Sequence, residues 1–244
     1  MLDNEKPSVI FLHGSGANSQ MWSEHIIALQ DTFNCIAPDF PGHGTRRGDM
    51  WTSLEDVTDS FAEIITSKCG GKAHLVGLSL GGSVIYKILE KYPHLVDKAV
   101  IDGASAKPIA GSRFIAMGVK MVAPFIKYDP VIKIMAGALG VPPDGYESFR
   151  QSMKSVSPKA FGRAMAQANL ADMDIEKCNF TSPTLFISGE KEAEIMHLTH
   201  KFLSKKISGS RCYIYPGGSH AWMVKDPQTH IKLVKDWLTL NHGN

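Results

Sequence analysis

The chain has 244 residues, of which 43% are apolar and 20% are charged, and its formal net charge is +2. This composition is ordinary for a soluble globular protein, and the chain is long enough to bury a substantial core. A net charge so close to zero gives no reason to expect nucleic acid or an anionic membrane as a partner. The most apolar segment, residues 114–126, is interrupted by Gly118, Lys120 and Pro124, so no segment is predicted to span a membrane.

Residues 1–6 are polar and lack the apolar segment of a signal peptide. The four cysteines are far apart and show no metal-binding spacing: Cys35, Cys69, Cys178 and Cys212. Cys35 and Cys212 fall in strand-like runs and are expected to be buried thiols. We therefore expect a cytoplasmic, reduced protein that holds no metal.

Six short apolar runs are predicted to be strands. They cover residues 8–12, 34–37, 73–76, 98–101, 184–187 and 211–215. Segments of helical length alternate with them, which is typical of βαβ units and a parallel sheet. Several runs are apolar at every position, as expected where helices cover both faces of the sheet.

Helices are predicted between these strands, the first over residues 19–29. The second begins at Thr52, where Glu55 three residues later completes a capping-box pattern, and it continues to Lys68. The last begins at Asp226, an N-cap residue followed by proline at the first helical position. Its apolar face is formed by Ile231, Val234, Trp237 and Leu238.

Residues 105–177 interrupt the alternation. This segment has no strand pattern, and its prolines divide it into several short helices. We interpret it as a helical cap inserted between two strands, with residues 1–104 and 178–244 forming the core. The segment also holds six methionines, and methionine adapts to irregular apolar ligands, which favours a substrate pocket under this cap.

A candidate nucleophile, Ser79, lies at the centre of the sequence Gly-Leu-Ser-Leu-Gly, residues 77–81. A predicted strand precedes this sequence and a predicted helix follows it. A serine on a sharp strand-to-helix turn is the nucleophile elbow of serine hydrolases. The flanking glycines let strand and helix approach closely, and the N–H groups at the helix start stabilise developing negative charge.

A serine nucleophile needs a base, and the base needs an acid that orients it. His220 is the candidate base, because it lies in a glycine-rich loop directly after the last predicted strand. The acid is expected in the loop after the preceding strand, where we favour Glu192. Glu190, Glu194 and Asp102 remain alternatives.

The tetrahedral intermediate of acyl transfer also needs two backbone donors, an oxyanion hole. One is expected to be the N–H of Leu80, next to the nucleophile. The other is expected in the glycine-containing loop after the first strand, from Ser15, with Gly16 as the second choice. His13, in the same loop, is expected to make structural hydrogen bonds.

With these motifs in order, the chain resembles the α/β-hydrolase superfamily. The resemblance spans nearly the whole chain, from His13 through residues 39–44 and the serine turn to His220. It implies an α/β-hydrolase fold with a mostly parallel sheet of about six strands. The N-terminal hairpin common in relatives is expected to be absent or truncated, because only seven residues precede Ser8. In this superfamily the residue that matches Glu192 is usually aspartate.

The predicted function is hydrolysis of a carboxylic ester or related acyl substrate, of small to medium apolar character, through an acyl-enzyme. This reaction needs no cofactor, and its expected partner is a small-molecule substrate. The expected pocket residues are Trp22, Met117, Met121, Phe125 and Trp222. Alternatives on the same fold are a carbon–carbon bond hydrolase, a lyase or a thioesterase. An alternative of another class is a small-ligand receptor that retains the fold.

Overall fold

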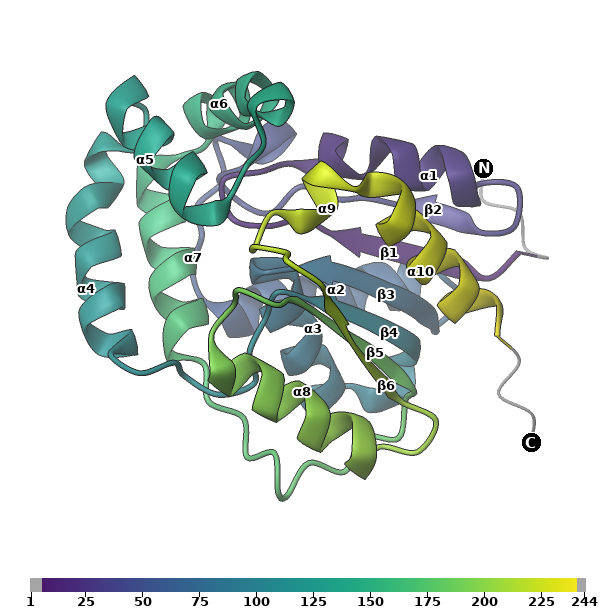
Figure 1. Ribbon diagram of the computed structural model, residues 1–244. Helices are drawn as coiled ribbons and strands as arrows, with labels where there is room; N and C mark the ends of the chain where they lie inside the picture. Colours follow the sequence, from purple (N-terminus) through teal and green to yellow (C-terminus); the bar gives the residue numbers. More distant parts are fainter. Residues whose placement is uncertain (1–5, 241–244) are drawn as a thin grey trace.

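The computed structural model describes residues 6–240, and within them it forms one six-stranded sheet (Figure 1). Every pair of neighbouring strands is parallel, in the order β2-β1-β3-β4-β5-β6. The strands are β1 (Ser8–Leu12), β2 (Asn34–Ile36), β3 (Ala73–Leu78), β4 (Val96–Asp102), β5 (Thr184–Gly189) and β6 (Arg211–Tyr215). The predicted fold class, a parallel α/β sheet of about six strands, is confirmed.

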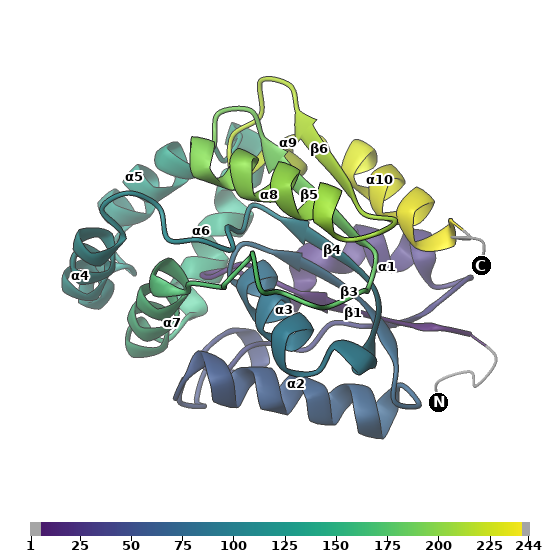
Figure 2. The same ribbon diagram turned by 90° about the horizontal axis from the view of Figure 1, so that it is seen from below.

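Two layers of helices cover the two faces of the sheet. Because successive strand residues point to opposite faces, Val9 and Phe11 of β1 pack into one apolar cluster, and Ile10 and Leu12 pack into the other. The first cluster includes side chains of α1 (Ser23–Leu29) and α10 (Pro227–Thr239). The second includes side chains of α2 (Leu54–Lys68), α3 (Leu80–Lys91) and α8 (Glu194–Lys206). Figure 2 shows α2 and α3 on one side of the sheet and α1 and α10 on the other.

The element boundaries differ slightly from the predicted ones. Strands β3, β4 and β5 are longer than predicted, because each continues further toward the edge where the loops gather. The N-cap of α2 is Ser53, whose side chain accepts the N–H of Asp56, so the capping pattern starts one residue after Thr52. The N-cap of α10 is Asp226, as predicted, and it accepts the N–H of Thr229.

Short helical turns complete the part of the chain outside residues 105–177. They are η1 (Ser19–Trp22), η2 (Gly44–Arg46), η3 (Pro93–Leu95) and α9 (Trp222–Lys225). The predicted first helix, residues 19–29, therefore consists of η1 followed by α1.

Residues 105–177, called the insertion below, contain no strand. They form α4 (Ser112–Val122), η4 (Ala123–Phe125), α5 (Asp129–Leu139), η5 (Pro143–Gly145), α6 (Tyr146–Ser155) and α7 (Pro158–Leu170). Figure 1 shows these helices beyond the edge of the sheet at which the strands end. The insertion has a small apolar cluster of its own that includes Ile126, Ile132 and Met153. Ala160 and Ala164 of α7 instead join the cluster around α2 and α3, so the insertion is packed onto the sheet helices.

Three expectations concern the chain as a whole. No helix within residues 6–240 is both long and apolar enough to cross a lipid bilayer. The cysteines are unpaired and partly exposed, so Cys35 and Cys212 are less buried than expected. The polar N-terminal stretch lies, apart from Lys6, outside the described residues.

The contact between α3 and β1 leads to a prediction about stability. A Cβ atom at Gly81 would lie 2.1 Å from the carbonyl oxygen of Leu12, far inside van der Waals contact. We expect Gly81→Ala to lower the free energy of unfolding by about 3 kcal/mol or more, because backbone must move to make room. Urea denaturation followed by circular dichroism measures this change.

The matched control is Gly118→Ala in the middle of α4, where a Cβ atom would meet nothing within 4 Å. There alanine should leave stability unchanged or raise it by about 1 kcal/mol through its helix propensity. Equal effects of the two substitutions would contradict the role assigned to the α3–β1 contact.

Candidate active site

Ser79 lies on a sharp turn between β3 and α3. Its backbone angles are φ 55° and ψ −111°, and it is the only non-glycine residue with positive φ among residues 6–240. Such a conformation is strained for a residue with a side chain, so the surroundings must hold it. The N–H of Ser79 donates to the carbonyl oxygen of Asp102 at 2.8 Å, which fixes the turn against the end of β4.

His220 and Glu192 are joined by a hydrogen bond. Nδ1 of His220 lies 2.7 Å from Oε1 of Glu192, and the other carboxylate oxygen accepts the N–H of Gly189 at 2.8 Å. The Glu192 side chain is 6% exposed and that of His220 is 25% exposed. Because the carboxylate accepts from Nδ1, it leaves Nε2 of the neutral ring free to accept a proton.

The pKa of His220 reflects two opposing effects. Burial lowers the pKa, but the hydrogen bond and negative charge of Glu192, with the charge of Asp102, outweigh it. The pKa therefore lies above its ordinary value of 6.5. A buried carboxylate beside the ring is the physical cause of this shift.

Two of the alternative acids, Glu190 and Glu194, form no hydrogen bond with His220. Oε2 of Glu190 accepts the N–H of Gly217 at 2.7 Å, and the residue is exposed. Glu194 is exposed at the first position of α8. Of the candidates in this loop, Glu192 is the one that forms the hydrogen bond with His220.

The remaining alternative acid, Asp102, belongs to a buried network that no sequence pattern indicated. Its Oδ1 accepts the indole N–H of Trp222 at 3.2 Å, and its Oδ2 lies 3.4 Å from Nε2 of His230. Nδ1 of His230 in turn lies 2.7 Å from Nε2 of His25. Burial and the nearby His230 lower the pKa of His25 to about 2, so this ring is neutral. Asp102 therefore anchors the helical turn that follows His220 rather than contacting His220 by a hydrogen bond.

The loops that carry Glu192 and His220 are bonded to one another. The N–H of Lys191 donates to the carbonyl oxygen of Gly218 at 2.8 Å. A Cβ atom at Gly189 would lie 2.6 Å from that same oxygen, so the backbones are in direct contact. This close approach fixes the loop of Glu192 relative to the loop of His220.

The loop of His220 is also bonded to the insertion. The N–H of Ala221 donates to the carbonyl oxygen of Leu139, the last residue of α5, at 2.9 Å. Gly140 ends this helix with φ 73°, and a Cβ atom there would lie 2.1 Å from Oγ of Ser219. The left-handed turn and the close contact both require glycine at this position.

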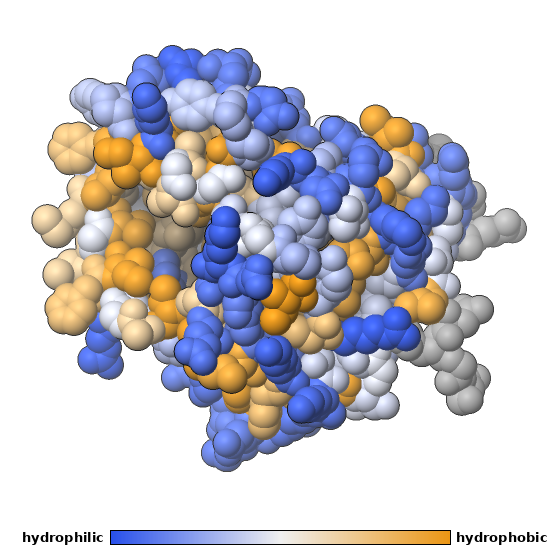
Figure 3. All heavy atoms as spheres, in the orientation of Figure 1, coloured by the Kyte–Doolittle hydropathy of each residue, from blue (hydrophilic) through white to orange (hydrophobic). Residues whose placement is uncertain are grey.

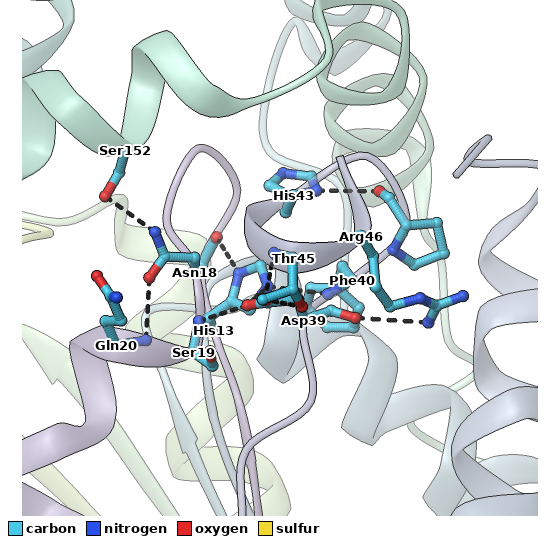
Figure 4. A network of polar contacts seen from close by, with 12 residues as sticks. His13, Asn18, Ser19, Gln20, Asp39, Phe40, His43, Thr45, Arg46 and Ser152 are labelled. Carbon is cyan, nitrogen blue, oxygen red and sulfur yellow. Dashed lines mark hydrogen bonds and ion pairs between the residues drawn. The ribbon is translucent and has the colours of Figure 1, made fainter. Parts of the chain in front are cut away.

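The loop after β1, which contains Ser15, is held by the polar network in Figure 4. Nε2 of the buried His13 accepts the N–H of Phe40 at 3.0 Å, so its Nδ1 carries the proton that bonds the carbonyl oxygen of Gly14 at 2.8 Å. Burial and the neighbouring His43 lower the pKa of His13 to about 3, which keeps the ring neutral. These are the structural hydrogen bonds expected of His13.

Asp39 connects this loop to the loop after β2 (Figure 4). Oδ1 accepts the N–H of Ser19, and Oδ2 accepts both the N–H and the hydroxyl of Thr45, each at 2.7 Å. Burial alone would raise the pKa of Asp39, but these hydrogen bonds outweigh it and lower the pKa. Asn18 extends the network to the insertion through a hydrogen bond to Ser152 of α6 at 3.4 Å.

Two cavities meet at the serine turn, since Ser79 and His220 line both. The larger, of about 890 Å³, is also lined by Leu80 and by polar side chains such as Asn169. The smaller, of about 520 Å³, is also lined by Ser15. Its apolar walls include Leu78, Met135, Leu139, Phe149, Phe161 and Met165. Ser79 therefore borders one mostly apolar cavity and one whose lining mixes polar and apolar groups.

Three lysines line the larger cavity and were not singled out in the sequence: Lys107, Lys191 and Lys225. Lys107 forms an ion pair with Asp172 at 2.8 Å, while the other two are exposed. They come from three separate loops and helix ends, so no local motif could have identified them as a group.

The expected pocket residues of the insertion lie elsewhere. Met117, Met121 and Phe125 are 56%, 69% and 55% exposed, and none of them lines either cavity. The expectation that they form the pocket is therefore corrected. Helix α4 packs against α7 through small residues such as Ala116, which turns the larger side chains outward.

The two tryptophans expected near the site are both buried. Trp222 lines the larger cavity and stacks on Tyr215, with ring centroids 4.3 Å apart. Trp22 lies instead in the apolar cluster under α1 and α10, 5.3 Å from the ring of Phe11, and lines neither cavity. Trp22 is therefore a core residue, and its expected place in the pocket is corrected.

Comparison with known proteins identifies the family of the chain. The sequence pattern of the alpha/beta hydrolase family matches residues 9–229 of the chain. The chain belongs to the alpha/beta hydrolase family.

Several known proteins are similar to this chain over almost their full length. The 2-(acetamidomethylene)succinate hydrolase of Mesorhizobium japonicum is 25% identical, over 95% of this chain and 88% of that protein. The pimeloyl-[acyl-carrier protein] methyl ester esterase of Vibrio vulnificus is also 25% identical, over 91% of each chain. The crystal structure of the enol-lactonase from Burkholderia xenovorans superposes with a TM-score of 0.84 at 18% identity, covering 96% of this chain and 92% of that one. This superposition confirms the fold.

The network around Asp39 leads to a prediction about stability and pH. In Asp39→Asn an amide N–H₂ replaces one acceptor oxygen and faces a backbone donor, so we expect a loss of about 1–3 kcal/mol in the free energy of unfolding at neutral pH. The folded-state pKa of Asp39 is lowered, so its stabilising contribution is present above the unfolded-state pKa of about 4 and is lost as pH falls through the folded-state value. The difference between wild type and variant should therefore shrink in acid.

Urea denaturation at a series of pH values measures this difference. The control is Asp49→Asn, which removes an exposed partner of Arg46 and should cost less than about 1 kcal/mol. If the difference between wild type and Asp39→Asn stayed constant from neutral pH to values well below pH ~4, the assigned hydrogen bonds would be contradicted.

Proposed function

We propose that the protein is a serine hydrolase that cleaves a carboxylic ester or a related acyl substrate. Ser79 attacks the acyl carbon, and His220 accepts the hydroxyl proton and returns it to the leaving group. Glu192 orients the imidazole ring. Water then attacks the acyl-enzyme with the same base, which releases the acid and restores Ser79.

The observation that carries this proposal is the position of Ser79 and His220 at the junction of the two cavities. A substrate that spans the junction would place its reacting carbonyl group beside the strained serine. The hydrogen bond between His220 and Glu192 supplies a base with a fixed tautomer and a buried acid. Related proteins that cover nearly the whole chain are named as a hydrolase and as a methyl ester esterase, which supports the reaction class.

Two backbone N–H groups are proposed to bind the oxyanion. Leu80 is the first residue of α3, so its N–H has no acceptor within the helix and lies at the positive end of the helix dipole. Ser15 lies in the loop that the Asp39 network holds, and it lines the smaller cavity next to Ser79. A rigid loop favours catalysis because a preorganised donor needs no rearrangement in the transition state.

The two cavities also favour a substrate that has two chemically different parts. The smaller, apolar cavity suits an acyl chain of small to medium size. The larger cavity, with its lysines and Asn169, suits a polar or anionic portion on the other side of the reacting carbonyl group. A substrate with an apolar acyl part and a polar remainder fits both.

The alternatives on this fold remain a carbon–carbon bond hydrolase, a lyase and a thioesterase, because the same residues can serve each reaction. A small-ligand receptor would use the cavities without chemistry at Ser79. A fluorophosphonate probe separates these alternatives: labelled Ser79 without esterase activity favours the other reactions, whereas an inert Ser79 with saturable ligand binding favours a receptor.

Ser79→Ala tests the nucleophile. We expect kcat for p-nitrophenyl esters to fall by about 10⁵–10⁶-fold, because loss of a triad serine removes the covalent route. Labelling by the fluorophosphonate should also disappear. Ser204→Ala on the outer surface of α8 is the control and should keep both properties. Undiminished ester hydrolysis in folded Ser79→Ala would overturn the proposed mechanism.

Glu192→Gln tests the acid through the pH profile. The profile of kcat/KM should rise with pH as His220 loses its proton, with a midpoint above the ordinary histidine value. Glutamine removes the charge that raises this pKa, so the acidic limb should move to lower pH while activity falls about 10⁴-fold. The control Glu194→Gln alters an exposed helix-start carboxylate and should leave the profile unchanged. If Glu194→Gln and Glu192→Gln gave the same profile, Glu192 would not be the orienting acid.

A further inference from the structure

The outer surface of the insertion carries a group of exposed apolar side chains that neither cavity uses. We name this group the outer apolar face. It consists of Phe114, Ile115, Met117, Met121, Val122, Phe125, Tyr128 and Ile134. Figure 3 shows orange and tan side chains gathered over α4 and its surroundings at the left of the molecule. Phe114, Ile134 and Met121 are 77%, 72% and 69% exposed, which is unusual for side chains of this size.

The geometry of α4 directs this face away from the protein. Phe114, Met117 and Met121 are spaced three and four residues apart, so they lie in one row along the helix. The small residues Ser112 and Ala116 lie on the opposite side and are buried. The exposed large side chains thus form a ridge along α4, and none of them lines either cavity. Figure 1 shows α4 at the outer side of the insertion.

Cations flank the ridge. Arg113 and Lys120 border it along α4, and Lys127 and Lys133 follow it in the chain; all four are exposed. Within residues 6–240, none of these four has a carboxylate within ion-pair distance. The surface is therefore locally cationic, which the net charge of the whole chain conceals.

Residues 113–134 contain one carboxylate, and it does not offset these cations. Asp129 is bound by Arg150 at 2.7 Å and by Lys154 at 2.9 Å, both from α6. Its charge is thus already neutralised within the protein. A partner of the outer apolar face would meet apolar side chains surrounded by positive charge.

We propose that the outer apolar face docks onto the surface of an anionic lipid bilayer. An apolar ridge bordered by lysine and arginine is the arrangement of helices that lie in the membrane interface. The ridge would enter the headgroup and acyl-chain boundary while the cations contact anionic headgroups. A second copy of the chain fits less well, because face-to-face pairing would bring the unpaired cations of both copies together.

The docked orientation also affects how a molecule from the bilayer would reach Ser79. Helix α5 contributes Ile134 to the outer apolar face and Ala138 and Leu139 to the walls of both cavities. Ile134 and Ala138 are four residues apart, so they lie on the same side of α5 and the outer apolar face adjoins the cavity wall there. An amphiphilic molecule leaving the bilayer would meet the cavity wall along this helix.

Flotation with phospholipid vesicles tests the proposal without any assay of activity. We expect the wild-type chain to bind phosphatidylcholine vesicles that contain phosphatidylglycerol, to bind pure phosphatidylcholine much less, and to release in high salt. The triple substitution Phe114→Ser, Met117→Ser and Met121→Ser should weaken binding at least about tenfold. These side chains are more than half exposed, so the fold should be retained, and circular dichroism checks this.

Two further variants sharpen the test. Arg113→Gln with Lys120→Gln should weaken binding to anionic vesicles and reduce its salt dependence, because two of the four cations remain. Leu198→Ser with Phe202→Ser removes exposed apolar side chains of α8 and should leave binding unchanged.

Three outcomes would overturn the proposal. They are no binding to anionic vesicles, equal binding to neutral and anionic vesicles, and equal loss of binding in the α8 control. Analytical ultracentrifugation completes the test: a dimer that the α4 triple substitution abolishes would assign the face to a second copy instead. Because Ser79→Ala leaves the outer apolar face intact, vesicle binding and the proposed hydrolase reaction succeed or fail separately.

Discussion

The close approach of α3 to the sheet is the constraint on which the candidate site depends. The backbone of Gly81 lies against the carbonyl group of Leu12, and Gly77 has no room for a side chain because Gly81 is beside it. This contact compresses the link between β3 and α3 into a turn too sharp for ordinary backbone angles. Ser79 takes the strained conformation, so its side chain stands at the edge of the sheet where both cavities meet. Strain at this residue is sustained by packing elsewhere, as is common at functional sites.

The other parts of the site are fixed by contacts between loops. His13 and Asp39 hold the loop after β1, and the bonded loops of Glu192 and His220 keep these two side chains in contact. All of these loops follow the carboxyl ends of parallel strands, which gather at one edge of the sheet. The fold therefore assembles the site from segments that are far apart in the chain.

The sequence alone was sufficient to predict the sheet and to predict which candidate residues lie at its edge. Ser79 and His220 could be predicted because each follows an apolar strand and lies among glycines that permit a sharp turn or a close contact. Glu192 was harder, since three glutamates occur within five residues, and the hydrogen bond to His220 singles it out. The pocket could not be predicted from residue type. Met117 and Met121 are as apolar as Met135, but the packing of α4 on α7 turns the first two outward, while Met135 lines a cavity.

The hydrogen bond between Ala221 and Leu139 has a consequence for how this architecture can be varied. By its position in the chain, the insertion could be exchanged as a module to change the substrate. Its helix α5, however, ends against the loop of His220, and the contact between Gly140 and Ser219 leaves no room for another residue type. A chimaera that exchanged the whole insertion would therefore lose a support of the His220 loop together with a wall of the cavities. An exchange limited to the residues that follow Gly140, up to the end of the insertion, would keep this helix end together with its own loop.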